Sequence, residues 1–251
     1  MSDRLPEFIG LGVQKGGTTT LQRLLEQHPD VFLPAEKELH YFSLHFIQGD
    51  NWYRQQFASA HSGQRCGEIT PYYLFHPQSP ARIKNLLPNA RLIVLLRDPV
   101  DRALSQYFHS RRLGMEPLDL EEALAAETER LEGSTQELEA IDGRHLSHQE
   151  HSYLSRSRYE LQVPLWQQRF SDCQLLILRS EDLFLKPQIV WEKVLQFLDL
   201  PGRPLPSLDR PANAGRGEAA QVPKVLRHAL RDQLAPTYAW VEQQLGIRWT
   251  S

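Results

Sequence analysis

The sequence predicts a single α/β domain with a P-loop-like central parallel sheet flanked by helices. Short apolar runs alternate along the chain with segments of helical periodicity. A glycine turn, "GVQKGGTTTLQRLL", joins the first apolar run to the first helical segment. No internal repeat or low-complexity linker divides the 251 residues. Because strands separated by helices are joined by right-handed crossovers, we expect one domain over residues 1–251.

Four apolar runs predict the strands of this sheet. They are short, bounded by polar residues or glycine, and almost free of alternation, which is typical of strands buried on both faces. The runs are 7–13 (EFIGLGV), 66–70 (CGEIT), 90–97 (ARLIVLLR) and 173–179 (CQLLILR).

Helical segments lie between these runs. After the glycine turn, Leu21, Leu24 and Leu25 recur at helical spacing, and Pro29 ends the pattern. A second helix is predicted over 98–112, where an aspartate and a proline suit the N-cap and the first turn. A further helix is predicted over 189–200.

Residues 113–155 differ in character from the rest of the chain. Most of this segment is acidic, polar and poor in aromatic residues, and Leu120, Leu124 and Leu131 predict one side of an amphipathic helix within it. We interpret it as a helical insertion. Two readings stay open: a solvated surface excursion, or a lid over a substrate site, since loops at such sheet edges commonly carry specificity.

Composition excludes several classes of protein. The formal charge of −3 provides no overall attraction for nucleic acids or membranes, so any anion site must be local. Cys66 and Cys173 match neither a disulfide framework nor a metal-ligand spacing, and we predict no metal site. The N-terminus does not resemble a signal peptide, and no apolar run is long enough to span a membrane. We therefore expect a cytoplasmic protein, whose oligomeric state the sequence does not indicate.

The glycine turn has the chemistry of an anion site. Lys15 precedes Gly16 and Gly17, and Thr18 and Thr19 follow directly. Backbone N–H groups at a helix N-terminus attract phosphate. In the nucleoside-triphosphate loop GxxxxGK[ST] the lysine instead follows the last glycine. A divergent P-loop kinase using this turn is disfavoured but remains an alternative.

A second turn repeats this arrangement. Arg97 ends the strongest predicted strand, and Ser105 follows on the next helix. The guanidinium can bind a phosphate through two hydrogen bonds, and the hydroxyl can add a donor. Where a magnesium-binding aspartate would end the strand, Arg97 is present instead. A ligand with two separate phosphate groups would bridge the two turns.

These motifs resemble the sulfotransferases that use 3'-phosphoadenosine 5'-phosphosulfate (PAPS), in particular the heparan-sulfate-type and related bacterial members. "QKGGTTTL" resembles their 5'-phosphosulfate loop, and "RDPVDRALSQY" resembles their 3'-phosphate motif. "HPDVFLPAEKELHYFS", "GEITPYYL" and the segment from "SRYELQVPLW" to "VLQFLDL" are also similar to segments of that family.

The resemblance implies that a sulfuryl group passes from PAPS to an acceptor by in-line displacement. A hydroxyl acceptor is expected in preference to an amine, and 3',5'-adenosine bisphosphate (PAP) is left. The cation of Lys15 would stabilise the leaving phosphate. The cofactor-binding residues implied are Lys15, Gly16, Gly17, Thr18, Thr19, Thr20, Arg97, Ser105, Tyr159 and Arg216.

The resemblance also implies a base that takes the acceptor proton. Glu38 in "AEKELHYF" matches the glutamate proposed for the glycan-modifying members, and His40 is either the base itself or a residue that orients the acceptor. Glu36 and Lys37 are expected to be solvated charges. Ile69 occupies the place of a lysine found in heparan-sulfate-type enzymes, which puts a heparan-like acceptor in doubt.

The acceptor class stays open. A small molecule, a lipid or polyketide, and a glycan all fit the resemblance. Five arginines either contact an acidic acceptor or lie exposed: Arg111, Arg112, Arg144, Arg156 and Arg158. A protein that binds PAPS but has lost sulfuryl transfer is the other alternative.

Overall fold

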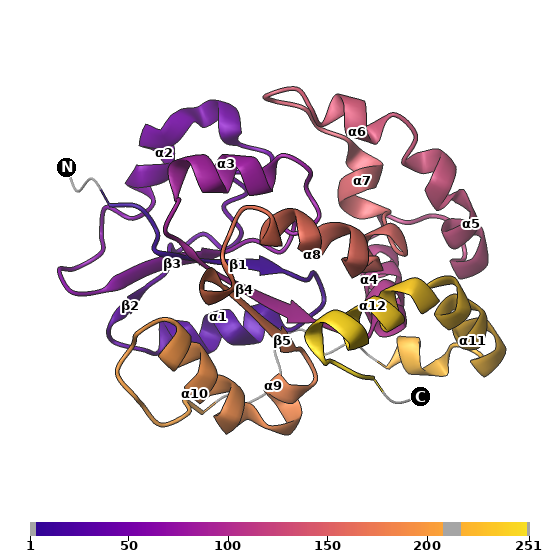
Figure 1. Ribbon diagram of the computed structural model, residues 1–251. Helices are drawn as coiled ribbons and strands as arrows, with labels where there is room; N and C mark the ends of the chain where they lie inside the picture. The colour runs from indigo at the N-terminus through magenta and orange to yellow at the C-terminus, as the bar shows by residue number, and fades with distance from the viewer. Residues whose placement is uncertain (1–3, 208–216, 250–251) are drawn as a thin grey trace.

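A computed structural model describes residues 4–207 and 217–249. Its centre is a five-stranded sheet in the order β2-β3-β1-β4-β5 (Figure 1). Every neighbouring pair of strands is parallel. The strands are β1 (Phe8–Gly12), β2 (Val31–Phe32), β3 (Arg65–Ile69), β4 (Arg91–Leu96) and β5 (Leu175–Arg179). The predicted fold class is therefore confirmed.

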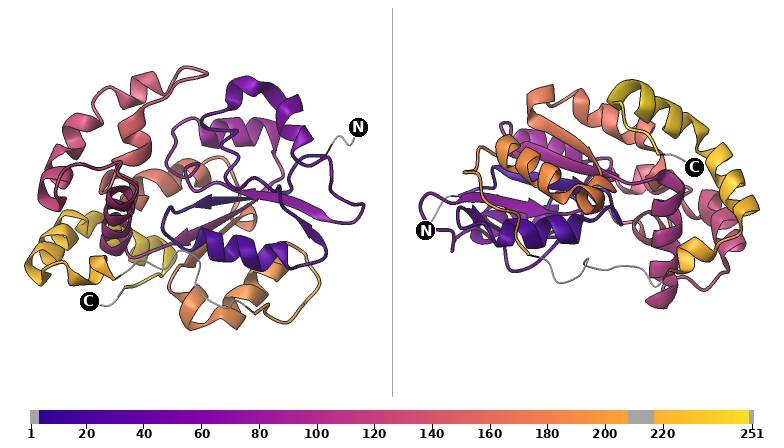
Figure 2. Two further views of the ribbon diagram at one scale, coloured as in Figure 1. Left: turned by 180° about the vertical axis from the view of Figure 1, so that it is seen from behind. Right: turned by 90° about the horizontal axis from the view of Figure 1, so that it is seen from below.

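Helices cover both faces of this sheet (Figures 1 and 2). One face carries α1 (Thr18–Glu26), α9 (Asp182–Leu185) and α10 (Pro187–Phe197). The other carries α2 (Gly49–Gln55), α3 (Ser79–Leu86) and α8 (Tyr159–Gln167). Side chains alternate along β1, so Phe8 packs into the core with α1 and α10, while Ile9 packs into the core on the opposite face. Burial on both faces explains why these strands read as continuous apolar runs.

The predicted elements agree with the observed ones to within a few residues, and the helix after β4 follows its predicted signals closely. This helix, α4 (Pro99–Arg112), begins with Pro99, and the Asp98 side chain accepts a hydrogen bond of 3.0 Å from the backbone N–H of Asp101. Strand β2 and helix α8, which contains Pro164, were not among the predictions. Neither were α11 (Lys224–Gln233) and α12 (Ala235–Leu245), which pack beside α4 and α8.

Short 3-10 turns complete the described chain: Phe46–Gln48, Ser155–Ser157, Asp172–Gln174 and η4 (Glu218–Gln221). The last of these contacts α4. Within the residues described, no helix is both long and apolar enough to cross a membrane.

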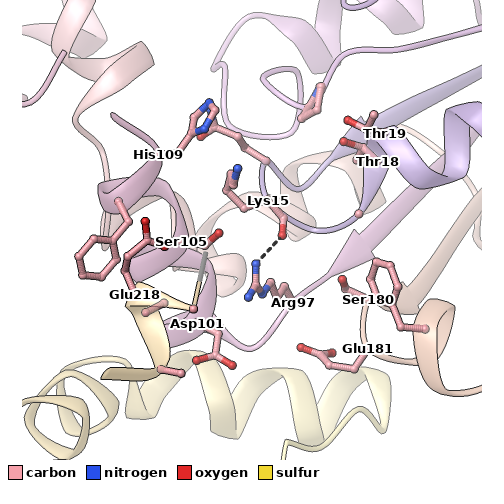
Figure 3. Close-up of a pocket in the computed structure, with 18 of the residues that line it drawn as sticks. Lys15, Thr18, Thr19, Arg97, Asp101, Ser105, His109, Ser180, Glu181 and Glu218 are labelled. Atoms are coloured by element: carbon pink, nitrogen blue, oxygen red, sulfur yellow. Dashed lines mark hydrogen bonds between the residues drawn. The ribbon is translucent and has the colours of Figure 1, made fainter. Parts of the chain in front are cut away.

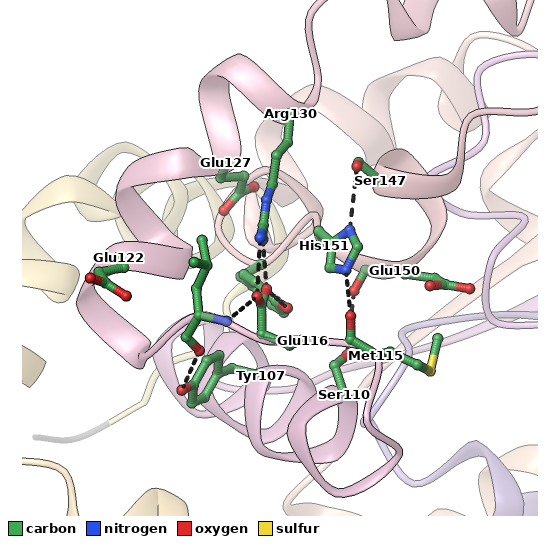
Figure 4. Close-up of polar contacts among 12 residues, drawn as sticks. Tyr107, Ser110, Met115, Glu116, Glu122, Glu127, Arg130, Ser147, Glu150 and His151 are labelled. Carbon is green, nitrogen blue, oxygen red and sulfur yellow. Dashed lines mark hydrogen bonds and ion pairs between the residues drawn. The ribbon is translucent and has the colours of Figure 1, made fainter.

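The insertion after α4 is helical, with α5 (Leu120–Arg130), α6 (Ser134–Glu137) and α7 (Leu146–Glu150). It is fastened by a buried carboxylate, that of Glu116 (Figure 4). Arg130 donates hydrogen bonds of 2.6 and 3.0 Å to Glu116, and the Tyr153 hydroxyl donates one of 2.6 Å. Burial alone raises the pKa of Glu116, but the hydrogen bonds from Arg130 and Tyr153 lower it to about 2. The insertion is thus held together by charged hydrogen bonds to a carboxylate that is itself shielded from solvent.

Candidate functional site

A cavity of about 880 Å³ opens beyond the carboxyl ends of β1 and β4, where α1 and α4 begin (Figure 3). Open parallel sheets bind ligands at this position, because the loops that follow the strands converge there. Its walls come from the β1–α1 turn, the face of α4, residues 37 and 38, the start of α9, and the segment around η4.

The β1–α1 turn wraps tightly against the strand ends. A Cβ atom on Gly16 would lie 2.6 Å from the carbonyl oxygen of Leu95, so only glycine allows this approach. Gly17 has a φ of 89° and forms the N-cap of α1. The Ser180 hydroxyl donates a 2.7 Å hydrogen bond to the carbonyl of Gly16. The turn therefore directs the N-terminus of α1 into the cavity, where it favours an anion.

The second turn lies directly beside the first. Arg97 Nη1 donates a 2.9 Å hydrogen bond to the backbone oxygen of Lys15, which joins the two turns. Ser105 projects from α4 into the same cavity (Figure 3). The sequence predicted two anion-binding turns on one sheet, and the structure brings their side chains Lys15, Arg97 and Ser105 to one cavity.

The cavity is rich in cations. Five of the described residues that line it are lysine or arginine: Lys15, Lys37, Arg97, Arg112 and Arg227. Three of them pair with carboxylates of the cavity, in the pairs Lys37–Glu38 at 2.6 Å, Arg112–Glu218 at 3.1 Å, and Arg227–Asp101. Among residues 4–207 and 217–249, Lys15 and Arg97 have no ion-pair partner. Glu181 is the one carboxylate of the described lining without an ion pair, so the unpaired cations exceed the unpaired carboxylates by one.

The pKa of Lys15 reflects both its burial and the cations around it. It falls from 10.5 to about 8, mainly because of burial and then because of the nearby cations Arg112, Arg97 and Lys37, while Glu38 opposes the shift. An anion bound between Lys15 and Arg97 would relieve both the repulsion and the desolvation. These two cations therefore favour a ligand of negative charge in this part of the cavity.

The segment with Glu38 and His40 forms the opposite wall. Lys37 donates from Nζ to the Thr19 hydroxyl at 2.8 Å and to Glu38 Oε1 at 2.6 Å. The prediction that Lys37 is a solvated charge is therefore wrong: it links this wall to the first turn of α1. Glu38 lines the cavity, as expected for a residue near the reacting groups.

A side pocket of about 120 Å³ continues from the cavity past Glu38. The two spaces share Gln14, Glu38, Pro71 and His109. His40 lines only the side pocket, with its Nε2 3.7 Å from Glu38 Oε2. Burial lowers the pKa of His40 to about 4, against the opposing effect of Glu38, so its imidazole is neutral at neutral pH. The ends of the insertion contribute Met115 and Gln149 to the pocket wall.

Some predicted cofactor residues lie away from the cavity surface. Gly16 and Thr20 are buried behind the turn. Tyr159 is fully buried, and its hydroxyl donates a 2.9 Å hydrogen bond to the carbonyl of Arg97, so it supports the second turn from behind. Arg216 lies outside the described residues.

The five arginines whose role the sequence left open lie in different places: at the cavity, at the side pocket or on the surface. Arg112 lines the cavity, and Arg156 lines the side pocket, where it donates a 2.6 Å hydrogen bond to Gln14. Arg111 donates to the backbone oxygen of Glu116 at 2.8 Å. Arg144 and Arg158 are exposed and line neither space.

Sequence reasoning missed several polar residues of the site, among them His109, Gln14 and Arg227. His109 lies one helical turn after Ser105 on the same face of α4, so helical periodicity could have found it. Gln14 directly precedes the predicted lysine. Arg227 comes from the C-terminal α11, and no sequence signal connects that helix with the cavity. In the described part of the chain, no three His, Cys, Asp or Glu side chains cluster as a metal site would require.

Comparison with known proteins identifies relatives of the chain. A family model described as "Sulfotransferase domain" matches residues 5–210. "Membrane-associated sulfotransferase kil1" of Dictyostelium discoideum is 42% identical over 109 residues, which cover 42% of this chain and 23% of that protein. Human "Heparan sulfate glucosamine 3-O-sulfotransferase 3B1" is 42% identical over 106 residues, covering 42% of this chain and 27% of the relative. The match thus spans only a minor part of the length of these curated relatives.

Solved structures extend the likeness to the whole chain. A sulfotransferase from Alicyclobacillus acidocaldarius has a TM-score of 0.80 and 27% sequence identity, covering 98% of both chains. Mouse sulfotransferase SULT7A1, complexed with PAP, has a TM-score of 0.60 and 14% identity over 97% of this chain and 86% of that one, which shows a shared fold. Because the family model runs from β1 through α10, across both turns that line the cavity, the chain belongs to the sulfotransferase domain family.

Proposed function

We propose that this protein transfers a sulfuryl group from PAPS to an acceptor hydroxyl. One observation supports the proposal most: two adjacent turns place the unpaired cations Lys15 and Arg97 at one cavity. PAPS has a phosphosulfate at one end and a 3'-phosphate at the other, so its two anionic ends match two separate sites. Family membership supports the reaction class.

The first turn would hold the phosphosulfate. The N-terminus of α1 and the Thr18 and Thr19 hydroxyls line the cavity and offer hydrogen-bond donors to the 5'-phosphate. As the sulfuryl group leaves, negative charge grows on the bridging oxygen of that phosphate. A protonated Lys15 beside this oxygen would stabilise the transition state more than the ground state.

The second turn would hold the 3'-phosphate. The hydrogen bond to Lys15 O fixes the guanidinium of Arg97 at the cavity, and Ser105 adds a hydroxyl from α4. A guanidinium held in this way loses little side-chain entropy when it binds phosphate. This contact would distinguish PAPS from nucleotides that lack a 3'-phosphate.

Glu38 is the base that we propose for the acceptor proton. It lies where the cavity meets the side pocket, so an acceptor in the side pocket and PAPS in the cavity would meet at its carboxylate. His40 lies within the side pocket and is neutral at neutral pH, which suits a residue that orients the acceptor hydroxyl.

The acceptor would enter through the side pocket, with the ends of the 113–155 insertion as one wall. This role extends the prediction of a lid over the acceptor site, in the form of a segment already closed by the Glu116–Arg130 contact. The 3-O-sulfotransferase relative supports a hydroxyl acceptor, and a glycan is one candidate besides small molecules and lipids. A cytoplasmic location stays a prediction, to be tested by cell fractionation.

The first experiment is calorimetric titration of the protein with PAP, with 5'-AMP and ATP–magnesium as controls. We expect PAP to bind at least about tenfold more tightly than 5'-AMP, because a charged hydrogen bond to the 3'-phosphate contributes about 1.5–3 kcal/mol. A preference for ATP–magnesium would instead support the kinase alternative.

The second experiment follows sulfuryl transfer from radiolabelled PAPS to a panel of acceptors: heparan sulfate, 4-nitrophenol and a long-chain primary alcohol. Transfer to one of them would support the proposal and assign the acceptor class. Tight PAP binding without transfer to any acceptor would favour a PAPS-binding module that has lost activity.

A further inference from the structure

A buried carboxylate lies behind the segment that carries Glu38 and His40. Glu68, near the end of β3, is 2% exposed and lines neither the cavity nor the side pocket. Three hydroxyl groups donate hydrogen bonds to it: Tyr53 at 2.6 Å, Tyr73 at 3.0 Å and Thr70 at 2.9 Å. Burying a charged carboxylate costs free energy, so the position of Glu68 calls for a structural or functional explanation.

The hydrogen bonds around Glu68 connect it to three backbone amides of the loop formed by residues 38–42. The backbone N–H of Leu39 donates to Glu68 itself. The Thr70 hydroxyl accepts the backbone N–H of His40 at 3.5 Å, and the Tyr73 hydroxyl accepts that of Phe42 at 3.3 Å. Each of these loop amides therefore reaches Glu68 directly or through one hydroxyl.

The loop needs this support because its backbone is unusual. Glu38 has a φ of 60° and His40 a φ of 51°, the left-handed region that residues other than glycine seldom adopt. Leu39, between them, is 2% exposed, so its side chain anchors the loop in the core. Such conformations persist only where surrounding contacts hold them.

We propose that Glu68 is a positioning residue that holds residues 38–42 in the conformation that places Glu38 between the cavity and the side pocket. This inference rests on the proposed function, because Glu38 is the base there. Only an ionised carboxylate can accept from three hydroxyls and a backbone N–H without offering a donor of its own. Because the Thr70 and Tyr73 hydroxyls donate their hydrogens to Glu68, their oxygen atoms remain free to accept the backbone N–H groups of the loop.

The surroundings of Glu68 are consistent with these hydrogen-bond directions. Burial, and the nearby charge of Glu68, raise the pKa of Tyr53 and of Tyr73 well above 10, so both remain donors. Burial raises the pKa of Glu68 to about 7, against the lowering effect of its four hydrogen bonds. The experiments are therefore set at pH 8, where most of the carboxylate is ionised.

Two variants separate positioning from packing. Glu68→Gln keeps the side-chain size but replaces one acceptor oxygen with an NH₂ donor, which opposes the hydroxyl donors. Tyr53→Phe is the matched control. It removes the shortest hydrogen bond to the same carboxylate from an equally buried site, but the Tyr53 hydroxyl bonds to Glu68 and not to residues 38–42.

Hydrogen–deuterium exchange of residues 36–45 tests the proposal without any acceptor. We expect the amides of Leu39, His40 and Phe42 to exchange at least about tenfold faster in Glu68→Gln, and within about twofold of wild type in Tyr53→Phe. PAP affinity should stay within about threefold in both variants, while turnover with the best acceptor of the panel falls at least about tenfold in Glu68→Gln alone.

Wild-type exchange in Glu68→Gln, or equal acceleration in both variants, would overturn the proposal. A wild-type protein that transfers no sulfuryl group would remove the proposed function, while the exchange rates would still decide whether Glu68 holds the loop. If Glu68→Gln does not fold, Thr70→Val removes the Thr70 hydroxyl, and with it one hydrogen bond to Glu68 and the link to His40, while the contacts of Glu68 with Leu39 and Tyr73 remain. Faster exchange at His40 in that variant supports the proposal, and unchanged exchange there overturns it.

Discussion

Proton uptake on PAP binding should depend on Lys15. In the free protein the pKa of Lys15 is lowered to about 8 by burial and by the guanidinium groups of Arg112 and Arg97. A phosphate beside the ammonium group favours the charged form and raises this pKa again. The complex therefore binds more protons than the free protein, and PAP affinity must fall as the pH rises through 8.

The size of the effect follows from the pKa in the free protein. With a pKa of about 8, the fraction of Lys15 without its proton is about 0.1 at pH 7, about 0.5 at pH 8 and about 0.9 at pH 9. PAP binding should take up the same number of protons, and affinity should fall about tenfold from pH 7 to pH 9. The phosphates of PAP do not add to this, because their second pKa is near 6. Burial holds the pKa of His109 below 6.5, outside the same window.

The assay is calorimetry of PAP binding in two buffers of different ionisation enthalpy at each pH. The difference in heat between the buffers gives the number of protons taken up. Lys15→Arg is the control variant, because it keeps the positive charge but does not titrate in this range. It should bind PAP with no proton uptake and with an affinity that does not change between pH 7 and pH 9.

Two results would refute this reasoning. Wild-type protein that takes up no protons at pH 8 would mean that no bound phosphate lies beside Lys15. The same uptake in Lys15→Arg would mean that another group titrates on binding.

Other substitutions test the remaining parts of the site. Arg97→Ala should weaken PAP binding about 10- to 100-fold, the loss of a charged hydrogen bond, and leave 5'-AMP binding within about threefold; equal weakening in calorimetry would place the 3'-phosphate elsewhere. Glu38→Gln should keep PAP affinity while transfer from PAPS falls at least about 100-fold, and retained turnover would exclude it as the base. Glu116→Gln should lower the free energy of unfolding in urea by about 3 kcal/mol, since it removes the buried negative charge that pairs with Arg130. The exposed Glu121→Gln should change it by less than about 0.5 kcal/mol, and equal effects would show that the insertion does not depend on this ion pair.

The sequence by itself determined the elements whose signals are local. Strands β1 and β4 are apolar runs because both their faces are buried, and α4 begins at Asp98 and Pro99 because capping chemistry acts within one helical turn. Gly16 and Gly17 predicted a tight turn, because the backbone freedom of glycine is likewise a local property. Two such turns after strands of one parallel sheet must lie at the same edge, so Lys15, Arg97 and Ser105 were expected together.

The tertiary structure alone decided which other side chains lie around Lys15, Arg97 and Ser105. Lys37 reaches Thr19, Arg227 enters the cavity from α11, and Tyr159 supports Arg97 from behind. These contacts join parts of the chain far apart in sequence, and no local pattern encodes them. The lowered pKa of Lys15 has the same origin, because burial and two neighbouring guanidinium groups exist only once the chain is folded.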